Sequence, residues 1–234
     1  MNLNFRKPVF IIPGAWNQAI LQRPEWLARW VYGYAEGNRV ETLQVYEDNP
    51  VTHLARLIQY IEDIGILVEP GRLSLFVNVT DNIEHIFESL EEKVINIVNT
   101  LQHTPISGYG VNFSFEIQSP SDTLLGVFDT TDNIKKKGYN VKGEKITVSM
   151  KFEEGVILNL GKENIEGRVM LDFNYHHEKF DLEKFKEKGR GSIFRFYNQT
   201  LDILKNCYEA DTEDITILRH SFKEVPNAVK EDKN

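Results

Sequence analysis

Apolar and polar residues alternate in several short segments of this chain, and that alternation constrains the fold more than any other feature. Leu73–Val79 is the clearest case, and Tyr109–Ile117 repeats it with Val111, Phe113 and Phe115 on one side. A period of two is typical of a β-strand that buries one face. The same reasoning predicts strands at residues 8–16, 39–46, 145–152, 156–160 and 168–177, with the last three joined as hairpins by residues 153–155 and the polar stretch 161–167.

Two long segments instead carry the three- and four-residue apolar spacing of amphipathic helices. The first spans residues 83–101, with glutamates on its other side and Thr80 or Asp81 as the expected N-cap. The second starts at Leu182, or at Gly191 if the glycines at 189 and 191 break it, and its apolar side continues to Tyr208. Shorter helices are predicted at residues 24–31, from residue 49 to a glycine at 65, and after residue 120.

These elements predict an α+β fold, with an antiparallel or mixed sheet of about six to eight strands and amphipathic helices packed on one face. We expect a single domain over residues 1–222, followed by a polar flexible tail at 223–234. Two similar halves, 1–128 and 138–222, are the alternative, joined by a polar loop that contains three consecutive lysines.

Composition excludes several classes of function. The formal net charge of -8 at pH 7 argues against binding of nucleic acid through phosphate neutralisation. The only cysteine, Cys207, cannot form an internal disulfide, and we expect it to be partly buried in the last helix. The first apolar run is too short for a signal peptide or a membrane span, so the expected setting is cytoplasmic, without a membrane partner.

Three local patterns suggest chemistry but lack the features that it requires. Pro8–Trp16 resembles the first strand and loop of the α/β-hydrolase family, but the chain has no Gly-x-Ser-x-Gly motif to expose a nucleophile. His176 and His177 are adjacent on a predicted strand, so they point to opposite faces and cannot hold one metal ion. Gly108-Tyr109-Gly110 precedes a strand, so it presents no helix N-terminus to a phosphate and indicates a close backbone approach. We therefore expect no cofactor and no metal site.

Tryptophans at positions 16, 26 and 30 lie within fifteen residues of one another. They could line a ligand pocket or a partner surface. The interpretation that we favour is that Trp26 and Trp30 pack a short helix onto the sheet.

The outward sides of four predicted strands carry small or uncharged polar residues more than lysine or glutamate. The four rows are Arg72, Ser74, Phe76 and Asn78; Asn112, Ser114 and Glu116; Thr147 and Ser149; and Asp172, Asn174 and His176. Short amides and hydroxyls suit a face that another molecule covers, because they form hydrogen bonds without burying charge. The candidate binding residues on this face are Arg72, Asn112, Glu116, Asp172, Asn174 and His176.

Two classes of function remain open. The first is a non-enzymatic binding or assembly protein, which uses this face for a protein partner or for self-association as a homo-oligomer. The second is an enzyme or small-ligand-binding protein in which the carboxylates, His176 and Arg72 converge on the same face, with Glu116 or Asp172 beside His176 as an acid–base pair.

Overall fold

The computed structural model describes residues 3–33, 41–46, 55–61, 64–69, 71–77, 83–117, 120, 124, 137, 143–165, 168–179, 181–188, 191–212 and 215–217. Several sequence-based predictions fall outside these residues. They are the helix cap at residues 80 and 81, most of the helix expected after residue 120, the lysine-containing loop except residue 137, and the C-terminal tail.

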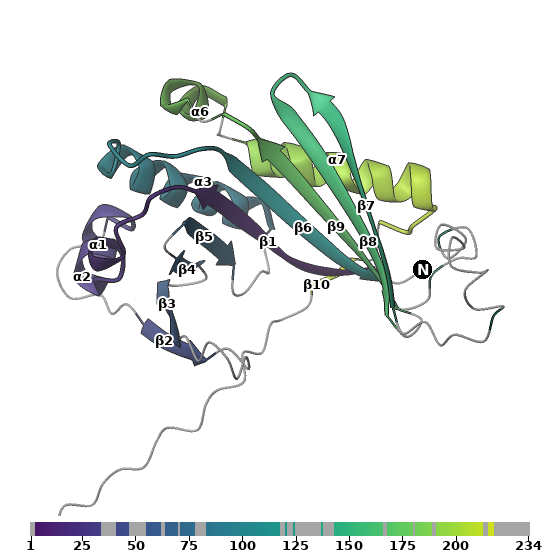
Figure 1. Ribbon diagram of the computed structural model, residues 1–234, viewed down its shortest axis with the longest axis horizontal. Helices are drawn as coiled ribbons and strands as arrows, with labels where there is room; N and C mark the ends of the chain where they lie inside the picture. The colour runs from purple at the N-terminus through teal and green to yellow at the C-terminus, as the bar shows by residue number, and fades with distance from the viewer. Residues whose placement is uncertain are drawn as a thin grey trace, which may run out of the picture.

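The described strands form one ten-stranded sheet (Figure 1). The strands are β1 (Leu3–Pro13), β2 (Glu41–Tyr46), β3 (Ala55–Ile61), β4 (Ile64–Glu69), β5 (Arg72–Val77), β6 (Tyr109–Ile117), β7 (Gly143–Glu153), β8 (Val156–Ile165), β9 (Arg168–His177) and β10 (Ile215–Ile217). The order across the sheet is β2-β3-β4-β5-β1-β6-β9-β8-β7, and every pair along this path is antiparallel. The short strand β10 pairs with β1 in parallel.

Helices pack against this sheet and close its core. They are α1 (Gln18–Leu21), α2 (Pro24–Trp30), α3 (Ile83–Thr100), α6 (Leu182–Lys188) and α7 (Ser192–Tyr208). The long helices α3 and α7 lie behind the strands in Figure 1, where α3 contacts β5 and α7 contacts β6. The predicted α+β class, with an antiparallel sheet and amphipathic helices packed against it, is confirmed.

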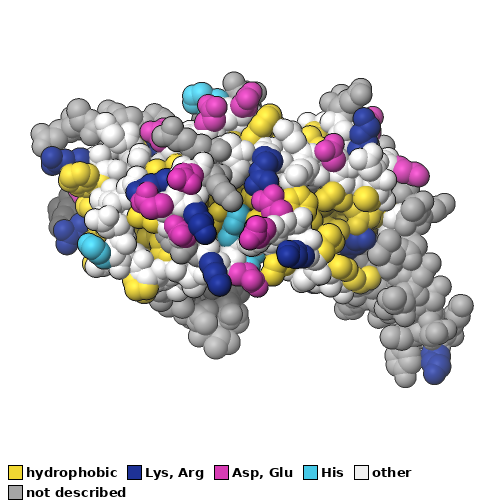
Figure 2. Space-filling model, turned by 90° about the horizontal axis from the view of Figure 1, so that it is seen from above, with side chains coloured by type: hydrophobic (Ala, Val, Ile, Leu, Met, Phe, Trp, Pro, Cys, Tyr) yellow, Lys and Arg dark blue, Asp and Glu magenta, His cyan; other side chains and the backbone are white. Residues whose placement is uncertain are grey.

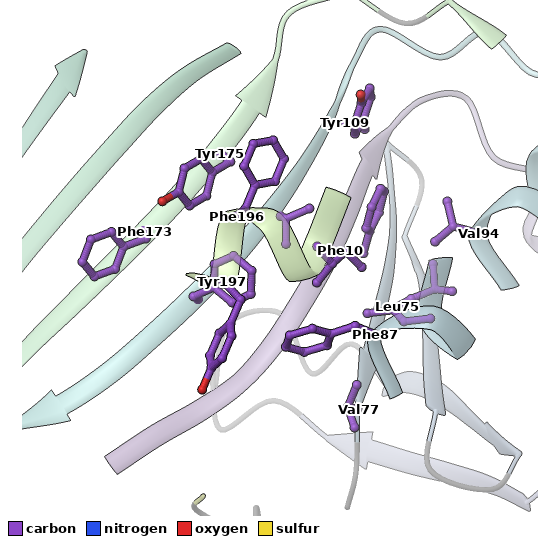
Figure 3. Close-up of a cluster of buried hydrophobic side chains, with 14 of the residues drawn as sticks. Phe10, Leu75, Val77, Phe87, Val94, Tyr109, Phe173, Tyr175, Phe196 and Tyr197 are labelled. Carbon is purple, nitrogen blue, oxygen red and sulfur yellow. The ribbon is translucent and has the colours of Figure 1, made fainter. Parts of the chain in front are cut away.

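Apolar residues alternate with polar ones along the strands, and the apolar ones form the sheet side of the hydrophobic core. On β6 and β9, every second residue is buried, and these side chains meet the apolar sides of α3 and α7 (Figure 3). Aromatic rings dominate this cluster: Tyr175 stacks on Phe196 with centroids 4.5 Å apart, and Phe87 contacts both Phe113 and Tyr197. Ring pairs of this kind hold elements together by area and by geometry.

The helix predicted from residue 49 to 65 is wrong for the part of that segment that the structure describes. Residues 55–61 and 64–69 form strands β3 and β4, which pair with each other, and Gly65 lies inside β4 opposite Tyr60 and Phe76. The apolar residues of this segment fit both a helical and an extended period, and its isoleucines and tyrosine favour strands. Pairing with β2 and β5, the strands on either side of this segment in the chain, decides between the two.

Three smaller predictions are also corrected. Strand β8 continues to Ile165, so most of the polar stretch expected to link the hairpins is part of the sheet. Trp26 is partly buried against the core, but Trp30 is 49% exposed and lies beside Arg29, so Trp30 does not pack α2 onto the sheet as predicted. Cys207 is exposed on α7 and not partly buried.

The final helical segment consists of two helices, as the glycine break predicts. Gly191 has φ +74°, a backbone conformation that non-glycine residues rarely adopt, and α7 begins at the next residue. The apolar side of α7 is buried as expected from Ile193 to Tyr208, although Leu201 is only partly buried.

Candidate functional site

The face of the sheet opposite the long helices carries the polar rows predicted from the sequence. The register places Asn112 of β6 opposite Asn174 of β9, Asn174 opposite Asn159 of β8, and Asn159 opposite Ser149 of β7. In the next row, Ser114 lies opposite Asp172. We call these residues the polar sheet face: Asn112, Ser114, Ser149, Asn159, Asp172 and Asn174.

Hydrogen bonds link one row of this face across four strands. Ser149 Oγ donates to Asn159 Oδ1 at 2.6 Å, and Asn159 Nδ2 donates to Asn174 Oδ1 at 3.0 Å. Asn174 Nδ2 in turn donates to Oδ1 of Asn112. The three asparagines are half-buried although no described helix lies over them, because each packs against its neighbours along the row. We refer to this row as the amide ladder.

The adjacent row is held by a charge-assisted bond. Ser114 Oγ donates to Asp172 Oδ1 at 2.5 Å, and both side chains are half-buried. Gly161 of β8 lies on the other side of Asp172, and a Cβ at Gly161 would be 3.4 Å from that of Asp172. The carboxylate is therefore seated between a serine and a glycine.

Glu116 lies at one end of the same face and interacts with a cation outside the ladder. It is 7% exposed, and its Oε1 is 3.6 Å from the guanidinium of Arg168, which is itself largely exposed. The register places Glu116 opposite Met170, so neither the amide ladder nor His176 is its cross-strand neighbour.

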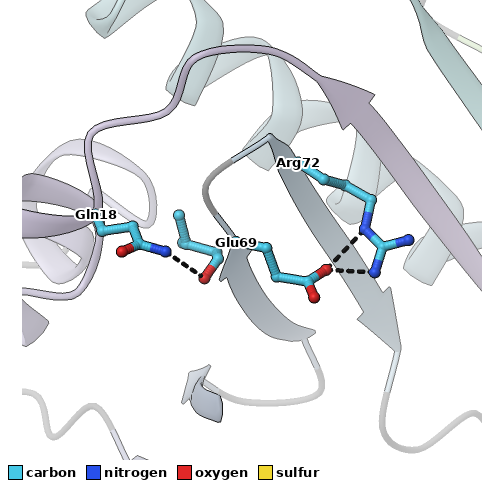
Figure 4. Close-up of polar contacts among 4 residues, drawn as sticks. Gln18, Glu69 and Arg72 are labelled. Atoms are coloured by element: carbon cyan, nitrogen blue, oxygen red, sulfur yellow. Dashed lines mark hydrogen bonds and ion pairs between the residues drawn. The ribbon is translucent and has the colours of Figure 1, made fainter. Parts of the chain in front are cut away.

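Arg72 is separated from the ladder by strand β1. Its guanidinium binds Glu69 of β4 across the β4–β5 turn (Figure 4), with Nε 2.7 Å from Oε2. Nearby, the amide of Gln18 on α1 donates to the carbonyl oxygen of Val68, as Figure 4 also shows. Arg72 therefore belongs to the β4–β5 hairpin and not to the polar sheet face.

His176 lies at the opposite end of the face from Glu116. It is half-buried between Gly110 of β6 and Ile157 of β8. At about 3.3 Å per residue, the six residues from Gly110 to Glu116 place these groups roughly 20 Å apart. Asp172 is four residues from His176 on β9, roughly 13 Å by the same spacing. The acid–base pair considered from the sequence does not form.

Sequence reasoning missed one member of the ladder. Asn159 alternates with Leu158 and Leu160 on β8, so a period-two assignment would have placed it on the outward side. The hairpins predicted from the sequence already place β8 between β7 and β9, so Asn159 could have been included among the candidates.

A cleft also lies at the end of the sheet near α6, with a volume of about 730 Å³. His177 stacks on Tyr109 with ring centroids 4.0 Å apart, and Phe185 of α6 meets Tyr109 edge-on. Arg195 forms two hydrogen bonds with Glu153, at 2.6 and 2.9 Å. Figure 2 shows this end of the molecule, where acidic and basic side chains lie intermixed. This cleft includes none of the six residues proposed from the sequence.

Electrostatics in the cleft do not favour general base catalysis by tyrosine. Burial raises the pKa of Tyr109 to about 12, so its phenol is protonated at neutral pH. The hydrogen bond to Glu153 raises the pKa of Arg195, so its guanidinium stays protonated. Ser192, also in the lining, donates its hydroxyl to Glu91 at 3.3 Å. Arg195 and Ser192 therefore each have a hydrogen-bond partner within the protein.

In the described part of the chain, no three His, Cys, Asp or Glu side chains are grouped so that they could hold a metal ion. Of the helices that the structure describes, none has the length and apolar character needed to cross a membrane. No protein-family model and no curated protein sequence matches the chain.

Proposed function

We propose that this chain is a non-enzymatic binding or assembly protein, and that another polypeptide covers its polar sheet face. The partner is a second copy of the chain or a protein of different sequence, and a second copy is the partner that purified protein tests first. The observation that carries this proposal is the amide ladder, which runs through Asn112, Asn174, Asn159 and Ser149.

The ladder lowers the free-energy cost of covering this face. A polar group that loses water without gaining a partner costs about 1–3 kcal/mol. Along the ladder, side-chain donors and acceptors already bind one another, so a covering polypeptide leaves fewer of them without partners. The solvent side of α3 is different, because Glu84, Glu88 and Glu92 are exposed carboxylates that would each lose hydration.

Within the polar sheet face, charge is limited to Asp172, whose carboxylate accepts a hydrogen bond from Ser114. Glu116 and Arg168 pair at one end, and Lys145 and Lys151 lie on the edge strand β7. A weakly charged centre with a charged rim is the usual arrangement of a protein interface.

The alternative, an enzyme or small-ligand site on this face, requires Arg72, Glu116, Asp172 and His176 to converge. Their separate positions on the sheet favour the binding proposal over this alternative.

The test is the molar mass in solution, measured by light scattering after size exclusion. Asn112→Lys with Asn174→Lys places two charges in the centre of the face, and we expect a lower mass than that of the wild type. Asn198→Lys with Asn206→Lys, on the exposed side of α7, is the matched control and should leave the mass unchanged. Equal masses for wild type and face variant, both folded, would contradict self-association through this face.

A further inference from the structure

Strand β7 ends the sheet, and its outer edge carries the second feature that points to a partner. Among the described residues, β7 pairs only with β8, over the length Gly143–Glu153. The outer edge of such a strand presents backbone N–H and C=O groups that another strand can bind. At eleven residues, β7 is long for an edge strand.

Exposed side chains make this edge unusual within the described chain. Val148 is 46% exposed and Met150 is 39% exposed. Among the described residues, only four large hydrophobic side chains are exposed, and these are two of them. Both project on the helix side of the sheet, because their partners on β8 are the buried Leu160 and Leu158. Thr147 and Ser149 are exposed on the other side.

The sequence of β7 is symmetric about Ser149. Outward from that serine in both directions, the residues are apolar, polar and apolar. The pairs related by this symmetry are Val148 with Met150, Thr147 with Lys151, and Ile146 with Phe152. An antiparallel pair of identical strands has a two-fold axis, so residues equally far from the axis lie opposite one another, and this pattern then places apolar residues opposite apolar ones.

We propose that β7 pairs antiparallel with β7 of a second copy of this chain, with the two-fold axis at Ser149. In this register, Val148 of each copy lies opposite Met150 of the other, which covers all four exposed apolar side chains. Lys151 lies opposite Thr147 of the second copy, and the irregularity between Lys151 and Glu153 ends the regular pairing beyond that point. Moving the axis to Val148 would instead place Lys145 opposite Lys151 twice, and like charges in that position are destabilising.

Lysines near the ends of β7 disfavour pairing with other strands, whereas the central residues of β7 are uncharged. Lys145 and Lys151 flank the central residues, and the register shifts between Lys151 and Glu153, as at a β-bulge. Lysines and bulges are the usual devices against indiscriminate edge pairing. A second copy in the Ser149 register avoids both lysine clashes, whereas an arbitrary partner strand does not.

This inference concerns the edge of the sheet, and Ser149 is the residue that the edge shares with the polar sheet face. Residues Asn112 and Asn174 lie on β6 and β9, which β8 separates from β7. A variant of the face therefore leaves the edge intact, and the two proposals can fail separately.

The experiment is disulfide cross-linking of Ser149→Cys in a Cys207→Ser background, which removes the only native thiol. Directly opposed residues of antiparallel strands have Cα atoms about 4.5–5.5 Å apart, which fits a disulfide. We expect mild oxidation to shift the mass from 27.1 kDa to twice that value. Val148→Cys is the matched control, because in this register it faces Met150 of the second copy and should link poorly.

Three further outcomes decide the proposal. Adding Asn112→Lys and Asn174→Lys to Ser149→Cys should leave the cross-link unchanged, whereas adding Val148→Lys and Met150→Lys should abolish it. Absence of a cross-link in folded Ser149→Cys protein would overturn the proposal. A stronger cross-link in the Val148→Cys variant than in the Ser149→Cys variant would also overturn it, because the axis would then lie elsewhere.

Discussion

The carboxylate of Glu91 on α3 accepts a hydrogen bond of 2.7 Å from the backbone amide of Ile193 in the first turn of α7. The amide of Gly191 and the hydroxyl of Ser192 donate to the same carboxylate, at 2.6 and 3.3 Å. Gly191 has no side chain to cap α7 itself, so a residue one hundred positions earlier in the chain supplies the cap. This contact fixes the start of α7 against α3.

Replacing Glu91 should therefore destabilise the protein more than replacing its exposed neighbour. Glu91→Ala leaves buried N–H groups without an acceptor, and we expect a loss of about 1–3 kcal/mol in the free energy of unfolding. Glu91→Gln keeps one carbonyl acceptor and should lose less. Glu92→Ala removes an exposed carboxylate that lies 3.5 Å from the buried Lys93, and it should change stability less than Glu91→Ala does. Urea denaturation of the three variants checks this order.

The same carboxylate should make stability depend on pH. Burial raises the pKa of Glu91 above its usual 4.5 and outweighs the amide hydrogen bonds that lower it. The folded state therefore holds this proton more tightly than the unfolded state. As pH rises from the unfolded pKa through the raised folded pKa, the wild type should lose stability relative to Glu91→Gln. Denaturation of both proteins between pH 4 and 8 measures the difference, and a rise with pH would show that the hydrogen bonds dominate.

The buried pair Tyr175 and Thr200 joins β9 to α7. Their hydroxyl oxygens are 2.9 Å apart, and Thr200 Oγ1 also donates to the carbonyl oxygen of Phe196. Tyr175→Phe removes one partner and leaves Thr200 bonded, so we expect a loss of about 0.5–1.5 kcal/mol. Thr200→Val leaves the buried phenol of Tyr175 without this partner and should cost more. The double variant should cost less than the sum, as a double-mutant cycle in urea would show.

Gly108 has a backbone position that admits no side chain. A Cβ there would overlap the carbonyl oxygen of His177 on the neighbouring strand. Gly108→Ala should therefore lower the melting temperature by several degrees, since about 1 kcal/mol corresponds to about 2–4 °C at this chain length. A Cβ at Gly71 meets nothing within 4 Å, so Gly71→Ala is the matched control. Equal melting temperatures for the two variants would contradict the close approach.

Elements with strong local periodicity were predictable from the sequence. The apolar positions of β5 and β6 are buried as the alternation predicts, and the helical spacing in α3 and α7 matches their buried sides. Residues 55–69 were not predictable, because their isoleucines fit two periods and partners on β2 and β5 decide between them. Exposure of Trp30 likewise depends on what packs beside α2, which no local pattern specifies.

For the candidate site, too, some features could be predicted from the sequence and others could not. That Asn112, Asp172 and Asn174 share an outward face follows from period two alone, and the structure places Asn112 against Asn174. The separation of Arg72, Glu116 and His176 follows from strand order and register, which depend on pairings between distant segments. Local pattern indicates the face of a strand, whereas only the assembled sheet determines neighbours.

The central claim, that another polypeptide covers the polar sheet face, is tested most directly by thiol accessibility. Ser114→Cys in a Cys207→Ser background places a near-isosteric thiol on this face, and Ser89→Cys places a similarly half-buried thiol on α3. We predict that labelling at position 114 slows as protein concentration rises, while labelling at position 89 stays constant. Rates that are independent of concentration at both positions would contradict coverage of the face by a second copy of the chain.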